Sequence, residues 1–400
     1  MYGKILYRGR IVEVGIEIEG ERIKKIGKSV KGRKVRGLIL PAAIDVHVHF
    51  RDLREKHKET IESGSLSAIH GGVCLVVDQP NCNPAITDSE VYEERMRRAK
   101  KKLYCDYALN FALTEKNREK IEEEVKKVSK KYFVPAIGEV FLQHSQGLQV
   151  SYNTLFSLKA DMITVHAEDA ELVKCNSIPN FDCRPEEAEV KAVEMCIKGL
   201  KKCHFCHIST VKALDVICKS SKKDFTKEVT PHHMLLSVKD YERLGSFVNV
   251  NPPLRSEPLL KYLDFFEIIA SDHAPHTPEE KKEGLPGFPG VETMYPIIVS
   301  LIKEGVIGLK AIDKLTSNPA RIFGFDKFGY GEIEEGMLAN FAVFDFSKEC
   351  RISSRNLHSL CGWTPYEGYK AIFPSEVWLR GENVLPDVKA GRVLGRVLEI

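Results

Sequence analysis

Eight short apolar runs, separated by polar or charged segments, constrain the fold of this chain more than any other feature. The runs are "AIDVHVHF", "GVCLVVDQP", "YCDYALNFAL", "FVPAIGEVF", "DMITVHAE", "KCHFCHIST", "KEVTPHHM" and "FEIIASDHAPH". Helical patterns lie between them, as in "SEVYEERMRRAKKK", "NREKIEEEVKKVSKKY" and "RPEEAEVKAVEMCIKGL". Because short apolar strands that alternate with helices are typical of a parallel sheet, eight such units predict an α/β fold, a (β/α)8 TIM-type barrel.

The two ends of the chain have a different pattern. Residues 1–41 have the pattern of short strands with turns at Gly9, Gly20 and Gly32. Strands punctuated by glycine return after residue 326, in "GYGEIEEGMLANFAVFDF" and "SEVWLRGENVLP". We therefore predict a barrel over residues 42–325 and a small β-sandwich domain built from both terminal segments, 1–41 and 326–400.

Composition limits the classes of partner and the location. Hydrophobic residues at 43% and charged residues at 29% are typical of a globular protein, and a net charge of +3 provides no strong basic field for nucleic acid. No signal segment and no apolar run of membrane-spanning length is recognisable, so we expect a cytoplasmic protein that binds a small molecule, with neither nucleic acid nor membrane as partner. The 11 cysteines lack framework spacing and favour buried thiols over disulfides.

Polar side chains close most of the apolar runs. The carboxyl ends of the strands of a (β/α)8 barrel share one rim, and that rim carries the active site. The residues predicted to meet there are His47, His49, Asn81, Glu139, His166, His207, His232 and Asp272.

Several of these residues form a candidate metal site. His47 and His49 stand two residues apart and point to the same side of a strand, although such a pair alone is often explained by packing. His166, His207 and Asp272 each close a further run. Four imidazoles with a carboxylate suit zinc or another divalent ion, so the sequence predicts a metal site at the rim.

Longer motifs make the chain similar to a known family. They are "DVHVHFRD", "DQPNCNP", "HAED", "CHIST", "EVTPHHMLLS", "VNPPLR", "SDHAPH", "GVET", "TSNPARIFG" and "GWTPYEG". Along nearly its whole length the chain resembles the amidohydrolase superfamily and, within it, the dihydroorotases. The histidine pair with a late histidine and aspartate is shared across the superfamily, whereas H-x-H-x-R-D, Q-P-N-x-x-P and V-N-P-P-L-R are narrower and point to dihydroorotate.

The resemblance implies roles for the metal-site residues. His47, His49 and Asp272 would hold the more buried ion, and His166 and His207 a second, with two zinc ions favoured over one. An activated water would attack the ring amide carbonyl, and Asp272 would pass a proton to the leaving ring nitrogen. In reverse, the reaction closes N-carbamoyl-L-aspartate to (S)-dihydroorotate in pyrimidine biosynthesis.

The resemblance also implies substrate contacts. Dihydroorotate carries a carboxylate, which Arg51 would bind with two parallel hydrogen bonds. Asn81 and His276 match family positions that assist this carboxylate, and Asn251 matches one that faces the pyrimidine ring. Alternatively, Arg51 would form a surface salt bridge with Asp52 and would not bind the substrate.

The chain departs from the family pattern at one position. Many dihydroorotases and hydantoinases carry a carbamylated lysine that bridges the two ions, but "GEVFL" places Glu139 there. Because the glutamate side chain is shorter, a bridge requires either a backbone that lies closer to the metals or ions that lie closer to this backbone. The alternative is a site that holds only one metal firmly. Other branches of the superfamily use a glutamate bridge, so we predict that Glu139 bridges. For His232 and His233, a place near the metals and a structural hydrogen bond both remain open.

Two other functions compete with a dihydroorotase. The first is another cyclic amidohydrolase, such as a hydantoinase or allantoinase, but that function would not explain the presence of Arg51 and "VNPPLR". A non-catalytic scaffold for an aspartate carbamoyltransferase would have lost metal ligands, whereas this chain keeps five and has a carboxylate in the sixth place. A homo-oligomer and an association with an aspartate carbamoyltransferase are left open.

Overall fold

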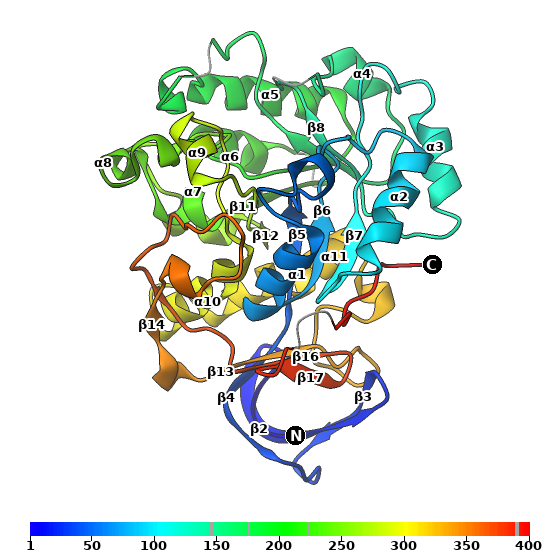
Figure 1. The fold of residues 1–400 in the computed structure, drawn as a ribbon, viewed down its shortest axis with the longest axis vertical. Helices are drawn as coiled ribbons and strands as arrows, with labels where there is room; N and C mark the ends of the chain where they lie inside the picture. The colour runs from blue at the N-terminus through cyan, green and yellow to red at the C-terminus, as the bar shows by residue number, and fades with distance from the viewer. Residues whose placement is uncertain (145–146, 175–176, 222–223, 389–391) are drawn as a thin grey trace.

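Eight strands form a ring at the centre of the computed structural model. Figure 1 shows helices packed around these central strands. The structure describes residues 1–144, 147–174, 177–221, 224–388 and 392–400. Each predicted apolar run contains one strand of the ring, so the (β/α)8 prediction is confirmed. The strands are β5 (Ala43–Val48), β6 (Val73–Asp78), β7 (Asp106–Leu109), β8 (Ile137–Phe141), β9 (Ile163–His166), β10 (Cys203–Phe205), β11 (Phe225–Val229) and β12 (Ile268–Ile269).

The ring consists of two parallel sheets that meet at two seams. One sheet has the order β5-β6-β7 and the other β12-β11-β10-β9-β8. A bridge between Phe111 and Ile137 joins β7 to β8, and a bridge between Val48 and His273 joins β5 to the residues after β12. The amide of His49 also donates to the carbonyl oxygen of His273 at 2.8 Å. The second seam therefore places His49 beside the segment that follows the last strand.

Helices surround the ring, and α2 shows why its sequence is helical. Asp88 caps its first turn, because the Asp88 side chain accepts from the amide of Val91. The buried residues Tyr92, Arg95, Met96 and Ala99 recur at helical spacing and form its inner face. The helices are α1 (Ile61–His70), α2 (Ser89–Ala99), α3 (Ile121–Val128), α4 (Tyr152–Ser157), α5 (Glu186–Gly199), α6 (Val211–Lys219), α7 (Pro231–Leu235), α8 (Tyr241–Leu244), α9 (Pro278–Lys282), α10 (Val291–Lys303) and α11 (Ser317–Phe323).

Both ends of the chain contribute to one further sheet, in the order β17-β16-β13-β4-β1-β2-β3. Its strands are β1 (Tyr2–Tyr7), β2 (Arg10–Glu19), β3 (Arg22–Gly27), β4 (Lys34–Pro41), β13 (Phe341–Phe344), β16 (Glu376–Leu379) and β17 (Glu382–Leu385). The sheet curves until the amide of Ile23 donates to Met337 O at 2.9 Å and that of Ala339 to Glu21 O at 2.8 Å. The joint terminal β unit is confirmed, and it is one continuous curved sheet because β4 pairs with strands from both ends.

Two parts of the C-terminal segment lie against the barrel instead of in this sheet. Residues 350–372, which include β14 (Cys350–Arg351) and β15 (Lys370–Ala371), pack on α10, where the amide of Ile372 donates to a helix carbonyl at 3.1 Å. Residues 392–400 run beside β7, and the amide of Leu398 donates to Tyr107 O at 2.9 Å. The three predicted domain limits stay a prediction.

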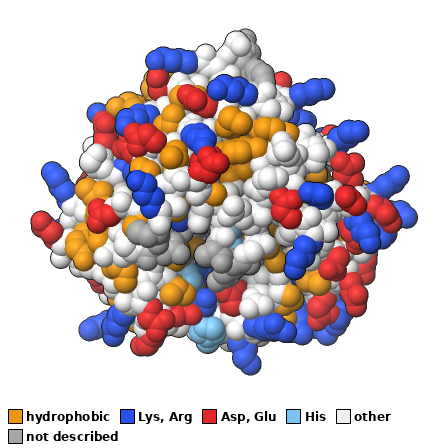
Figure 2. Space-filling model, turned by 90° about the horizontal axis from the view of Figure 1, so that it is seen from above, with side chains coloured by type: hydrophobic (Ala, Val, Ile, Leu, Met, Phe, Trp, Pro, Cys, Tyr) orange, Lys and Arg blue, Asp and Glu red, His pale blue; other side chains and the backbone are white. Residues whose placement is uncertain are grey.

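The predictions about cysteines, membrane-spanning segments and location differ in how far the structure tests them. Nine of the described cysteines are free thiols, of which seven are buried as expected, whereas Cys218 and Cys350 are exposed. Cys183 is disulfide-bonded, so the expectation of a thiol is wrong at that residue. In the described ranges, no helix combines the length and apolar character needed to cross a bilayer. Figure 2 shows basic and acidic side chains interspersed over one face of the molecule. The cytoplasmic location stays a prediction.

Candidate active site

The structure brings all six predicted metal ligands together at the carboxyl ends of the barrel strands. Each is buried, with between 1% and 7% of its surface exposed. They come from five different parts of the ring, so residues far apart in the sequence converge on one place. The residues are His47 in β5, His49 directly after β5, Glu139 in β8, His166 at the end of β9, His207 after β10 and Asp272 after β12.

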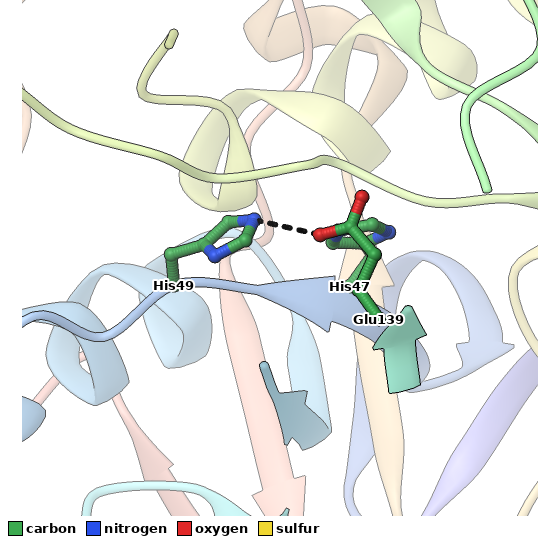
Figure 3. Close-up of side chains that lie close together, drawn as sticks. All are labelled: His47, His49 and Glu139. Carbon is green, nitrogen blue, oxygen red and sulfur yellow. Dashed lines mark ion pairs between the residues drawn. The ribbon is translucent and has the colours of Figure 1, made fainter. Parts of the chain in front are cut away.

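Glu139 lies at the centre of this cluster. Its Oε1 is 2.7 Å from His207 Nε2 and 3.0 Å from His166 Nδ1. Its Oε2 is 3.4 Å from His47 Nε2 and 4.0 Å from His49 Nε2, and Figure 3 shows both imidazoles beside this carboxylate. The two oxygens therefore face different histidine pairs. Each pair, together with Glu139, places its ligand atoms within 4.8 Å of one another.

The carboxylates and the unpaired ring nitrogens of this cluster fit a divalent cation. Burial would raise the pKa of Glu139, but His47, His166 and His207 lower it well below its usual range, so the side chain is a carboxylate. Asp272 Oδ1 lies 3.0 Å from His49 Nε2 and supplies a second carboxylate. Among the described residues, no hydrogen-bond partner reaches the buried His47 Nε2 or His207 Nδ1. Buried polar atoms rarely remain unpaired, and this nitrogen and oxygen donor set suits zinc.

Two buried glutamates outside the cluster orient its histidines. Glu228 in β11 lies 2.6 Å from His47 Nδ1 and accepts the amide of His207 at 3.1 Å. Burial would raise the pKa of Glu228, but His47 lowers it to about 2, so the group stays charged. Glu168 lies 2.8 Å from His166 Nε2. Carboxylates in this position fix the tautomer of a metal-binding histidine, and an acidic residue inside an apolar run was the only sequence signal for them.

A cavity of about 440 Å³ opens above the cluster and is lined by the predicted substrate residues. Arg51 Nε donates to Pro275 O and its Nη2 donates to His276 Nε2, both at 3.3 Å. Burial lowers the pKa of His276 to about 3, so the neutral ring accepts this hydrogen bond. Asp52 accepts the amide of Leu53 at 2.7 Å, and the ion pairs of the described residues include none between Arg51 and Asp52. The surface salt bridge considered as an alternative is absent there.

The two predicted asparagines also line the cavity, but each already has a protein partner. Asn81 Oδ1 lies 2.7 Å from His49 Nδ1, so Asn81 orients a predicted ligand. Asn251 Oδ1 accepts from Asn180 Nδ2 at 2.7 Å. The contact with Asn180 was not predicted from the sequence.

A buried arginine supports the chain beneath Arg51. Arg95, from α2, is 0% exposed and its Nη2 lies 2.6 Å from Asp78 Oδ2. Its Nη1 donates to the carbonyl oxygen of Arg51 at 2.9 Å, and its Nη2 also donates to that of Phe50. Asp78 in turn accepts the amide of Phe50 at 2.9 Å. These bonds fix the backbone that carries the guanidinium into the cavity.

The two histidines left open by the sequence differ in their contacts. His233 Nε2 donates to Pro252 O at 3.0 Å and its Nδ1 accepts from Thr230 Oγ1 at 2.9 Å, so its bonds are structural. His232 packs against Phe288 with ring centroids 5.1 Å apart. Burial lowers the pKa of His232 to about 3, while Asp272 opposes this shift. Both of its ring nitrogens lack a hydrogen-bond partner in the described part of the chain.

A separate trio of possible ligands, His70, Glu292 and His358, has unsuitable geometry. The two imidazoles are stacked, with centroids 3.6 Å apart and planes 18° apart. Nitrogen lone pairs lie in the ring planes, so those of nearly parallel rings do not converge on one ion.

Comparisons with known proteins agree with this geometry. The model of the amidohydrolase family matches residues 38–384. This chain belongs to the amidohydrolase family. It is similar to the dihydroorotase of Archaeoglobus fulgidus, at 56% identity over 98% of each chain, and to that of Pyrococcus furiosus, at 36% identity over 98% of this chain and 95% of the relative. The solved L-hydantoinase (dihydropyrimidinase) from Arthrobacter aurescens has the same fold, with a TM-score of 0.89 at 21% identity over 99% of this amidohydrolase and 98% of that chain.

Proposed function

We propose that this amidohydrolase is a dihydroorotase, which interconverts N-carbamoyl-L-aspartate and (S)-dihydroorotate in pyrimidine biosynthesis. The observation that carries the proposal is the position of Arg51, whose guanidinium enters the cavity that opens on the ligand cluster. A cyclic amide without a carboxylate would give this buried cation no counter-ion. The dihydroorotases of similar sequence support the same substrate.

Zinc is the proposed metal, with two ions preferred over one. His47, His49 and Asp272 would hold the first ion, His166 and His207 the second, and Glu139 would be shared between them. The division of the Glu139 oxygens between the two histidine pairs supports this assignment. When bound, the metal supplies a Lewis acid for the amide carbonyl and lowers the pKa of a water for attack at neutral pH.

Asp272 is the proposed proton carrier. Burial would raise its pKa, but the hydrogen bond with His49 and the nearby His47 hold that pKa below its usual range, so the group enters the reaction as a carboxylate. In the hydrolytic direction it takes a proton from the attacking water as the carbon–oxygen bond forms. It returns the proton to the ring nitrogen as the carbon–nitrogen bond breaks.

The remaining residues bind and orient the substrate. Arg51 would clamp the substrate carboxylate through two hydrogen bonds, with the neutral His276 and Asn81 at its side. Asn251, on the cavity wall formed with residues 283–287, would face the ring. The carboxylate and the scissile amide are thus held at separate ends of the cavity, which orients the amide for attack.

Substrate comparison on metal-analysed protein tests the proposal. We expect turnover of N-carbamoyl-L-aspartate and dihydroorotate to exceed that of hydantoin and allantoin, with zinc present by elemental mass spectrometry. A preference for hydantoin or allantoin would assign another cyclic amidohydrolase. Metal-free protein without turnover would favour the carbamoyltransferase scaffold. A homo-oligomer, an association with aspartate carbamoyltransferase and a cytoplasmic location are further predictions.

A further inference from the structure

Three asparagines form a hydrogen-bonded series along one wall of the cavity, which we call the amide relay: Asn249, Asn180 and Asn251. Asn180 is 5% exposed, and its Nδ2 donates both to Val250 O and to Asn251 Oδ1, each at 2.7 Å. Its backbone amide donates to Asn249 Oδ1 at 3.0 Å. Asn249 Nδ2 in turn donates to Gly284 O at 2.9 Å.

Backbone carbonyls fix the orientation of the amides in the relay. A carbonyl oxygen only accepts, so the Asn180 atom that faces Val250 must be the amide nitrogen. That nitrogen only donates, so the Asn251 atom that faces it must be Oδ1. A flipped Asn251 would place two donors 2.7 Å apart. The orientation of Asn251 is therefore set by Asn180 and the main chain.

The wall that carries the relay is itself held in place by a buried lysine. Lys281 Nζ donates to Asn249 O at 2.6 Å, Leu285 O at 2.8 Å and Gly287 O at 3.1 Å. These three bonds join the segment before Asn251 to the loop at residues 284–287. The relay thus has a fixed position relative to this loop of the cavity wall, and a specificity contact requires such support.

The consequence concerns the group that Asn251 presents to a substrate. Its Oδ1 is occupied by Asn180, and no described residue accepts from its Nδ2, so it offers a hydrogen-bond donor. Dihydroorotate has two ring carbonyls. The amide carbonyl that reacts must face the ligand cluster, and the ureide carbonyl between the two ring nitrogens still needs a donor.

We propose that Asn180 is a positioning residue that sets Asn251 to donate to the ureide carbonyl oxygen, so that this wall selects cyclic ureides with an acceptor there. The proposal rests on the proposed function, because it assumes dihydroorotate in this cavity. Asn180 itself does not touch the reacting atoms, and its effect passes through Asn251.

The analogue 2-thio-dihydroorotate tests the proposal, because it carries sulfur, a weaker hydrogen-bond acceptor, in place of the ureide oxygen. The natural chain should favour the oxygen substrate in kcat/KM by roughly 3- to 10-fold, the value of one neutral hydrogen bond. Asn180→Ala and Asn251→Ala should each remove this preference, mainly through KM, with metal content unchanged. The double variant should lose no more than either single variant, because both remove one interaction.

Controls keep the outcomes separate. Asn318, a half-buried asparagine that donates to Glu267 O at 2.8 Å on another part of the barrel, should leave the preference unchanged when replaced by Ala. Asn180→Asp, which cannot donate from its carboxylate, should repeat the loss if Asn180→Ala folds poorly. If the Asn180 variants keep the preference for the oxygen substrate over the sulfur substrate while Asn251→Ala loses it, the positioning role of Asn180 is overturned but the dihydroorotase assignment is not. A natural chain that turns over neither substrate would overturn the dihydroorotase assignment itself.

Discussion

Two clusters of buried charge lie at the carboxyl ends of the barrel strands, and only one of them is completed by the protein. The closed cluster consists of Asp78, Arg95 and Tyr107. Asp78 Oδ2 accepts from Arg95 Nη2 at 2.6 Å and from Tyr107 Oη at 2.5 Å, and no side-chain polar atom of the three is among the unpaired buried atoms of the described residues. One carboxylate meets one guanidinium, so the charges balance.

The open cluster consists of the six predicted metal ligands. It contains two carboxylates, and buried imidazole nitrogens of His47 and His207 have no hydrogen-bond partner in the described ranges. A buried charge is tolerated only when it is paired, so the difference between the clusters indicates what each does. The closed cluster is a structural ion pair, whereas we expect the open cluster to bind a cation and to be available for chemistry.

The largest expected effect is on activity in the open cluster. Asp272→Asn should lower turnover in both directions by about two to four orders of magnitude, because an amide cannot carry the proton. The melting temperature should change little. Activity is measured as kcat/KM for dihydroorotate and N-carbamoyl-L-aspartate on protein of checked metal content. A variant that keeps more than about a tenth of kcat/KM would show that another group carries the proton.

The closed cluster should respond in stability. Arg95→Met leaves Asp78 buried without its partner and should lower the free energy of unfolding by roughly 3 to 5 kcal/mol. Urea unfolding followed by circular dichroism measures this change. Arg97→Met is the matched control, since Arg97 lies on the same helix with its side chain 65% exposed, and its replacement should cost less than about 0.5 kcal/mol. Equal losses for both variants would remove the distinction between the clusters.

The two clusters also differ in how far the sequence predicts them. The barrel and the convergence of the six predicted ligands were predictable because strand ends share one rim, so the order of the runs alone placed His166 beside His207. Glu228 and Arg95 were not, because their contacts join segments whose relative rotation depends on packing: Glu228 meets His47 across 181 residues. The relay contact between Asn180 and Asn251, 71 residues apart, escaped prediction for the same reason.

The terminal segments show the same limit at the level of the fold. Alternation and glycines predicted strands at both ends, but not that β4 would pair with β1 on one side and β13 on the other. The segment 350–372 has few strand signals. Its apolar side chains, such as Tyr366, pack with residues of α10 in a separate core, and such a contact has no local sequence pattern.

Arg51 lies between the two clusters, since Arg95 holds its backbone while its side chain enters the cavity. Arg51→Met should lower kcat/KM for dihydroorotate, with a loss of transition-state stabilisation of roughly 2 to 5 kcal/mol. This is the cost of truncating one partner of a buried charge pair. The loss should be much smaller for dihydrouracil, the analogue without the carboxylate. Steady-state kinetics on both compounds measure the difference. Equal losses would mean that Arg51 supports the fold or the ligand cluster.

Glu139→Gln tests whether the open cluster holds two ions. The amide carries no negative charge, so the second metal, left with His166 and His207, should bind at least roughly 10-fold more weakly. Stoichiometry by elemental mass spectrometry should fall from two ions towards one. Reconstitution of the natural chain should not require bicarbonate, because no carbamate has to form. Two ions retained in the variant, with full activity, would rule out the bridge.

The smallest effect is expected in the trio of His70, Glu292 and His358, which has partners and lies partly at the surface. The hydrogen bond with Glu292, 2.8 Å from His358 Nδ1, raises the pKa of His358, whereas burial lowers that of His70 to about 4 and leaves it neutral. A raised folded pKa stabilises the protein below the unfolded value near 6.5, and this contribution disappears as pH rises through the folded pKa.

His358→Gln should therefore destabilise the protein more at pH 5.5 than at pH 9. The difference should be under about 1 kcal/mol, because the His358 side chain is 33% exposed and solvent screens the pair. Urea unfolding at both pH values measures it, and Glu292→Gln should reduce the same pH dependence since it removes the carboxylate. A loss that is equal at the two pH values would assign His358 to packing of the segment 350–372 alone. A pH-dependent loss would place this trio with the closed cluster, whose charges the protein itself completes.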